Sequence, residues 1–195
     1  MSSQEAQEQP PATKHEAQDT TRGWIWFITG PTACGKTTIA KSLAQSLGFT
    51  FAEGDDYHPP SNLEKMSRNQ PLTDADRAAW LDALRADEAP RRVVTCSALK
   101  RRYRDLLRDG HHTPREQQFR IGFVLLDVPE DVLRQRARER KGHFAGEGLV
   151  ESQLRDLELP GEEETDVLVV KVGRENGVED TLREVIERVR VKMES

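Results

Sequence analysis

Gly30-Pro31-Thr32-Ala33-Cys34-Gly35-Lys36-Thr37 has the form G-x-x-x-x-G-K-[ST], which is the pattern of the phosphate-binding P-loop. An apolar run of strand length, residues 24–29, comes directly before it. Residues 37–47 follow with apolar side chains four positions apart, and Gly48 then ends the pattern. A strand, a loop and a helix in this order let backbone N–H groups converge on one phosphate cluster. The segment therefore predicts a binding site for a nucleoside triphosphate.

The loop residues have separate expected roles. Lys36 is predicted to reach the β- and γ-phosphates, and the hydroxyl of Thr37 to coordinate Mg²⁺. A thiol at a helix N-terminus, such as Cys34, can be unusually reactive, but we favour the simpler interpretation of a small residue that fits beside the phosphate. The predicted nucleotide-binding residues are Gly30, Pro31, Thr32, Ala33, Cys34, Gly35, Lys36, Thr37 and Thr38.

Length and composition limit the class of protein. A chain of 195 residues is long enough for one domain with a core, and its net charge of −5 argues against a nucleic-acid-binding protein. No apolar run approaches the length of a transmembrane helix, and the two cysteines have neither disulfide-framework nor metal-site spacing, which fits a cytoplasmic protein. Residues 1–22 are rich in Gln, Glu, Pro and Thr, without an apolar segment, and are predicted to be a disordered tail. We expect one kinase domain over residues 23–195.

Strand and helix patterns alternate along that domain. Further strands are expected near residues 49–52, 92–96, 119–128 and 166–172, with Ser61 and Thr73 as the N-caps of two of the intervening helices. Alternation of this kind predicts an α/β fold with three layers and a central five-stranded parallel sheet. Ligands bind at the carboxyl ends of such strands, so the P-loop, Asp55-Asp56, residues 97–100 and the segment after the fourth strand are expected to converge.

Two of these segments carry residues suited to phosphoryl transfer. Asp55 follows the second strand, where a carboxylate can accept the proton of a substrate hydroxyl. Arg136 and Arg140 are four residues apart on one helix face, and the glycine-rich residues 142–148 follow them. This pattern predicts a mobile lid, at about residues 136–150, whose guanidinium groups close over the transferred phosphoryl group. Lys36, Asp55, Arg136 and Arg140 are thus the predicted catalytic residues.

The chain resembles the gluconokinases, which are P-loop kinases of sugar acids. The resemblance is carried by Gly54-Asp55-Asp56-Tyr57-His58-Pro59, Asn62-Leu63-Glu64-Lys65-Met66, Pro71-Leu72-Thr73-Asp74-Ala75-Asp76-Arg77, Cys96-Ser97-Ala98-Leu99-Lys100 and Arg140-Lys141-Gly142-His143-Phe144. It covers nearly all of residues 24–172, in order. It implies ATP-dependent phosphorylation of D-gluconate at its 6-hydroxyl to 6-phospho-D-gluconate, which feeds the pentose phosphate pathway. It also implies Mg²⁺ as cofactor, the fold of shikimate and nucleoside-monophosphate kinases, and a homodimer.

Gluconate is a small polyhydroxylated carboxylate, so its site needs cations and hydrogen-bonding groups. The candidates within the matching segments are Asp55, His58, Lys65, Arg77, Lys100 and His143.

Three other functions were weighed against this interpretation. A shikimate or nucleoside-monophosphate kinase would share the loop and the lid, but residues 96–100 do not match the acceptor motifs of those families. A GTP-dependent switch would need an Asn-Lys-x-Asp guanine-binding motif, which the chain lacks. A nucleotide-binding scaffold without activity would have no reason to keep all four predicted catalytic residues.

Overall fold

The computed structural model describes residues 23–68, 70, 72–86, 90–109, 119–139, 147–174 and 177–195, so the predicted tail lies outside it. The elements in chain order are β1 (Gly23–Thr29), α1 (Lys36–Leu47), β2 (Thr50–Ala52), the short 3₁₀ helix η1 (Gly54–Tyr57), α2 (Pro60–Ser67), α3 (Asp74–Ala86), β3 (Arg92–Thr95), α4 (Arg101–Asp109), β4 (Phe119–Asp127), α5 (Glu130–Glu139), α6 (Glu147–Asp156), β5 (Val167–Lys171) and α7 (Val178–Glu194).

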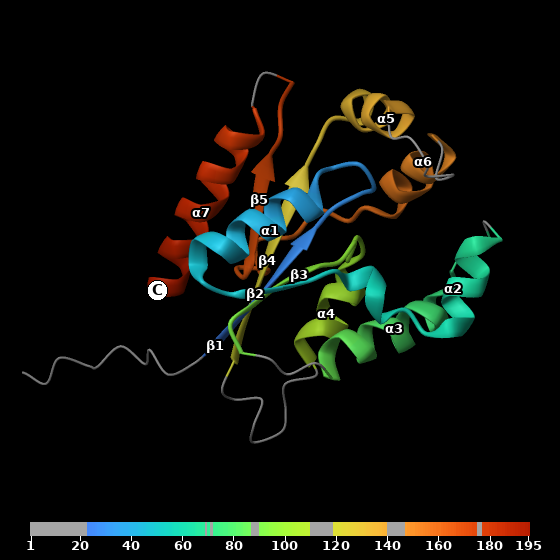
Figure 1. Cartoon of the computed structure of the whole chain (residues 1–195), viewed down its shortest axis with the longest axis horizontal. Helices are drawn as coiled ribbons and strands as arrows, with labels where there is room; N and C mark the ends of the chain where they lie inside the picture. The colour runs from blue at the N-terminus through green and yellow to red at the C-terminus, as the bar shows by residue number, and fades with distance from the viewer. Residues whose placement is uncertain are drawn as a thin grey trace, which may run out of the picture.

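The strands form one parallel sheet in the order β2-β3-β1-β4-β5. β1 is its centre and pairs with β3 on one side and β4 on the other. Helices α1 and α7 lie on one side of this sheet, and α3 and α4 lie on the other (Figure 1). The predicted three-layer α/β fold with five parallel strands is confirmed.

The side chains of β1 divide the core into two parts. Trp24, Trp26 and Ile28 pack in the cluster that includes α1 and α7, whereas Ile25 and Phe27 pack in the cluster with α3 and α4. Successive side chains of a strand point to opposite faces, so a continuously apolar strand is what a sheet covered on both faces requires. The core therefore fixes β1 rigidly, and the P-loop begins at its carboxyl end.

The first residues of α3 and α2 test the two predicted helix N-caps. Thr73 accepts a hydrogen bond from the backbone N–H of Asp76 (3.3 Å), and the Asp76 carboxylate accepts one from the Thr73 N–H (2.8 Å), so Thr73 is an N-cap as expected. The prediction for Ser61 is wrong, because α2 begins at Pro60 and its N-cap is Pro59, two residues before Ser61. Proline at the first helical position fixes φ for the helix and needs no N–H partner.

None of the helices in the described part of the chain has the length and apolar character needed to cross a membrane.

Candidate active site

The P-loop joins β1 to α1 at the carboxyl edge of the sheet. Gly35 is the N-cap of α1 with φ 103°, a left-handed conformation that side chains rarely adopt. No side chain caps this helix start, and no acidic residue lies in its first turn. The backbone N–H groups and the positive end of the helix dipole are therefore available to an anion.

Lys36 lies across this loop. Its Nζ donates to the carbonyl oxygens of Gly30 (2.9 Å) and Pro31 (2.8 Å). The N–H of Gly30 in turn donates to the carbonyl oxygen of Ser97 (3.2 Å), which ties the loop to the segment after β3. Cys34 is 2 % exposed, which favours its interpretation as a small packed residue. The ammonium group is thus held at the loop by neutral acceptors.

A carboxylate that the sequence interpretation left without a role lies beside Thr37. The Thr37 hydroxyl donates to Glu53 Oε2 (2.9 Å), and the Thr95 hydroxyl donates to the other oxygen of Glu53. Thr95 also accepts a hydrogen bond from the N–H of Gly54 (2.9 Å). A Cβ at residue 54 would lie 1.9 Å from the Thr95 carbonyl oxygen, so only glycine allows this close approach. The sequence signal that could have identified Glu53 as a site residue is its position directly after the strand β2.

This pair of oxygen donors fits a magnesium ion. Mg²⁺ prefers hydroxyl and carboxylate oxygens and commonly uses one or two protein ligands, with phosphate oxygens and water completing its octahedron. In the described ranges no cluster of three His, Cys, Asp or Glu side chains suits a metal ion. Thr37 and Glu53 match the one or two protein ligands of an ion whose other ligands are phosphate oxygens and water.

Asp55 lies two residues beyond Glu53, in η1. Its side chain is 73 % exposed, and its Oδ1 lies 3.9 Å from Nε2 of the buried His58. The indole N–H of Trp80 donates to the carbonyl oxygen of Gly54 (2.7 Å) and so anchors η1 to α3. Asp55 and His58 are thus brought together, with the carboxylate on the solvent side.

Three further predicted gluconate-binding residues are each near a carboxylate. Lys65 lies 2.7 Å from Asp76, and hydrogen bonds from Lys65 and Thr73 lower the pKa of Asp76 to about 2. Lys100 lies 2.8 Å from Asp156 at the end of α6, and this contact raises the pKa of Lys100. Lys100 therefore stays charged at neutral pH.

Arg77 lies 3.9 Å from Asp74, which also accepts a hydrogen bond from the Tyr103 hydroxyl (2.5 Å) and contacts Arg102 (2.6 Å). The Tyr103 hydrogen bond is the largest cause that lowers the pKa of Asp74, and the charges of Arg102 and Lys100 act in the same direction. Arg77 and Lys100 thus belong to one basic cluster around Asp74. The sequence interpretation gave Arg102 and Tyr103 no role, because their spacing on a charged helix does not show that they contact Asp74.

Residues of the predicted lid segment, and others just beyond it, reach the loop from α5 and α6. Arg136 donates from Nη1 to the carbonyl oxygen of Cys34 (3.4 Å), and Gln153 of α6 accepts a hydrogen bond from the backbone N–H of Thr32 (2.5 Å). Gln153 was not foreseen. Arg140 and His143 lie outside the described residues, so the structure gives no position for either. Three contacts bring the P-loop beside Ser97, beside Glu53 (which directly precedes η1) and beside α5: Gly30–Ser97, Thr37–Glu53 and Arg136–Cys34. The convergence expected for Asp55-Asp56 is thus made by the neighbouring Glu53.

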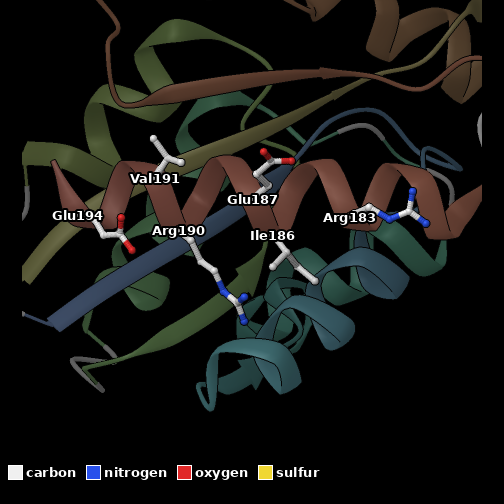
Figure 2. Close-up of a pocket in the computed structure, with 6 residues that line it drawn as sticks. All are labelled: Arg183, Ile186, Glu187, Arg190, Val191 and Glu194. Atoms are coloured by element: carbon white, nitrogen blue, oxygen red, sulfur yellow. The ribbon is translucent and has the colours of Figure 1, made fainter.

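A groove of about 340 Å³ lies elsewhere, on the outer surface of α7 (Figure 2). Its lining residues are Arg183, Ile186, Glu187, Arg190, Val191 and Glu194. Arg190 there donates to the carbonyl oxygen of Ser46 at the end of α1 (3.3 Å). None of these residues belongs to the P-loop, η1 or the α5–α6 segment, so we assign the groove no part in the chemistry.

Comparisons with known proteins agree with this geometry. A family model described as an AAA domain matches residues 27–156. A gluconokinase of Gluconobacter oxydans is 44 % identical over 180 residues, covering 89 % of this chain and 96 % of the relative. A probable gluconokinase of Schizosaccharomyces pombe is 41 % identical over 175 residues, covering 85 % and 88 %. The crystal structure of a gluconokinase from Sinorhizobium meliloti superposes with a TM-score of 0.69 at 36 % identity, covering 88 % of this chain and 98 % of that one.

Proposed function

Because this chain belongs to the gluconokinase family, we propose that it transfers the γ-phosphoryl group of ATP to the 6-hydroxyl of D-gluconate. The product would be 6-phospho-D-gluconate, an entry compound of the pentose phosphate pathway. The proposal rests mainly on one observation: the residues of the donor half and those of the acceptor half of a kinase site lie at the same edge of the sheet. Lys36 and Thr37 are on the donor side, and Glu53, in contact with Thr37, leads two residues later to Asp55 on the acceptor side.

On the donor side, the first turn of α1 binds the phosphates through its N–H groups, and Lys36 exchanges its carbonyl partners for phosphate oxygens. Thr37 and Glu53 would hold Mg²⁺, which would neutralise part of the phosphate charge. Arg136 approaches the loop from α5. Arg140 is assigned with it to the segment that closes over the transferred group from its four-residue spacing in the sequence alone. Closure excludes water, which would otherwise compete with gluconate as acceptor.

On the acceptor side, Asp55 orients the 6-hydroxyl and accepts its proton. The transition state of phosphoryl transfer is loose, so alignment of the hydroxyl matters more than early removal of its proton. Lys65, Arg77 and Lys100 supply positive charge for the gluconate carboxylate and donors for its hydroxyl groups. We assign His143 to the same site on the resemblance alone.

The test is an acceptor panel with the purified full-length chain. ADP release is measured with D-gluconate, shikimate and nucleoside monophosphates, and the product is examined by NMR for coupling between phosphorus and C6. We expect turnover with D-gluconate and phosphorus on the 6-oxygen. Absence of turnover with gluconate refutes the proposed substrate, and phosphorus on another oxygen refutes the proposed position.

Asp55→Asn is expected to lower kcat about 100-fold, because the amide cannot accept the proton and orients the hydroxyl less well. The KM values for ATP and gluconate should change little, since the residue acts mainly in the transition state. Steady-state kinetics with each substrate varied in turn provide the measurement. An unchanged kcat would place the proton acceptor elsewhere.

Lys65→Ala is expected to raise the KM for gluconate about tenfold, the cost of one hydrogen bond to a charged group. The KM for ATP serves as the internal control and should stay near the wild-type value, because Lys65 is on α2 and the phosphates bind at α1. A defect confined to ATP would remove Lys65 from the gluconate site.

Two further features of the proposal follow from the resemblance. We propose a homodimer and a cytoplasmic location. Sedimentation velocity measures the oligomeric state directly, and a single species of monomer mass at micromolar concentration would contradict the dimer.

A further inference from the structure

His58 is buried in a fixed orientation beside the acceptor site. It is 8 % exposed, and its ring stacks on the indole of Trp80 with centroids 4.4 Å apart and an interplanar angle of 18°. Trp80 is itself held, because its N–H donates to the Gly54 carbonyl next to Asp55. One face of the imidazole is therefore covered, and polar contacts must use the ring nitrogens in the ring plane.

The side chain of Asn62 determines which ring nitrogen carries hydrogen. Asn62 is 1 % exposed, and its Nδ2 donates to the backbone carbonyl oxygen of Asp76 (2.9 Å). A carbonyl oxygen only accepts, so the amide nitrogen, and not the amide oxygen, must point this way. The same Nδ2 lies 3.3 Å from Nδ1 of His58 and has one hydrogen left for it. Nδ1 is then an acceptor, and the ring hydrogen of the neutral imidazole sits on Nε2.

The protonated nitrogen faces the proposed proton acceptor. Nε2 lies 3.9 Å from Oδ1 of Asp55, whose exposed side chain can rotate to hydrogen-bond distance. Burial is the largest influence on the pKa of His58 and lowers it, Asp55 raises it, and Arg77 adds to the lowering. The net result is a lowered pKa, so the neutral form with a single Nε2–H is the relevant one at neutral pH.

We infer that His58 is a positioning residue for Asp55. Its Nε2–H donates to the Asp55 carboxylate and aims that carboxylate at the acceptor hydroxyl, while Asn62 and Trp80 fix the imidazole. The use of this contact in catalysis rests on the proposed function. It replaces the role of gluconate ligand that the resemblance implies for His58, because one face of the ring is stacked on Trp80, Nδ1 is occupied by Asn62 and Nε2 faces Asp55.

The contact itself is tested without substrate. Long-range ¹H–¹⁵N spectra of the full chain report which ring nitrogen of each histidine carries hydrogen, and the His58 signals are identified by their loss in His58→Gln. We expect the neutral Nε2–H form at pH 7.5, with an Nε2 signal that moves in Asp55→Ala while Nδ1 stays in place. An Nδ1–H form, or an Nε2 signal unaffected by Asp55→Ala, overturns the inference.

The catalytic consequence is tested by kinetics. His58→Phe keeps the stack on Trp80 but has no N–H, and we expect kcat to fall about 10- to 100-fold with little change in the gluconate KM. His58→Gln places an amide N–H at similar reach and should recover part of the loss. In an Asp55→Ala background, His58→Phe should cost nothing further, because the residue it positions is gone. Thermal unfolding of each variant identifies loss of folding.

A raised gluconate KM at unchanged kcat would make His58 a substrate ligand, and an equal loss in the Asp55→Ala background would make its role structural. Either result overturns the inference. If the wild-type chain does not phosphorylate gluconate, the proposed function fails, and the spectra still decide whether His58 holds Asp55.

Discussion

Lys36→Ala is expected to lower kcat about 1,000-fold. The ammonium group is the only side-chain charge that the loop itself contributes, and it stabilises the charge that moves onto phosphate oxygens in the transition state. The group donates to two carbonyl oxygens of the same loop, at 2.9 and 2.8 Å. Such neutral partners are readily exchanged for phosphate, so removal of the amine should affect turnover far more than folding.

The measurement is steady-state ADP release at saturating ATP and gluconate, with Lys41→Ala as the matched control. Lys41 lies on the same helix, with its amine over the ring of Phe51 and away from the loop, so its removal should leave kcat unchanged. Lys36→Arg should also be poorly active, because the planar guanidinium does not fit the place of a compact ammonium. A Lys36→Ala variant within tenfold of the wild type would contradict the proposed donor site.

The donor site could be read from the sequence because its geometry is local. Strand, loop and helix are contiguous over residues 23–47, and the positive φ angles of this stretch are those of Gly30, Ala33 and Gly35. Thr73 and Asp76 are likewise three residues apart, and their capping box followed from spacing alone. The prediction for Ser61 failed because Pro60 is a stronger local signal for the first helical position, which places the N-cap two residues earlier, at Pro59.

The remaining site contacts depend on chain segments that only the fold brings together. Glu53 meets Thr37 because β2 and the P-loop end at one sheet edge, and Gln153 meets Thr32 across 121 positions of sequence. In the sequence, Asn62 has no distinguishing feature as a polar residue of a mostly polar helix. The structure shows that its side chain contacts the Asp76 carbonyl oxygen and His58. Periodicity reports which face of a helix is buried, but it carries no information about the partner of a buried polar group.

A buried ion pair joins α4 to the segment that follows α6. The spacing of residues in the sequence did not predict it. Arg104 is 1 % exposed and donates to both carboxylate oxygens of Glu164, at 2.7 and 2.6 Å. Its third nitrogen reaches the carbonyl oxygen of Glu158 (3.1 Å) and, at 3.4 Å, that of Leu99. The pair therefore holds Leu99, which directly precedes Lys100 of the acceptor side, against the segment that follows the predicted lid.

Glu164→Gln is expected to lower the free energy of unfolding at pH 7 by about 3–5 kcal/mol, because it leaves the guanidinium of Arg104 buried without its counter-charge. The amide also turns a donor toward a group that only donates. Urea unfolding followed by circular dichroism measures the change. Glu163→Gln is the matched control, since Glu163 pairs with Arg101 at the surface, both about half exposed, and its loss should cost less than about 1 kcal/mol.

The dependence on pH identifies the cause of this loss. The hydrogen bond from Arg104 is the largest influence on Glu164 and lowers its pKa from 4.5 to about 2. A carboxyl group whose pKa is lower in the folded state stabilises the fold fully above its unfolded pKa and loses that contribution as the pH falls toward the folded value. The difference between wild type and Glu164→Gln should therefore be constant above about pH 5 and shrink from there toward pH 2. A difference that is below 1 kcal/mol at pH 7, or that does not shrink in acid, would mean that packing and not the ion pair holds this segment.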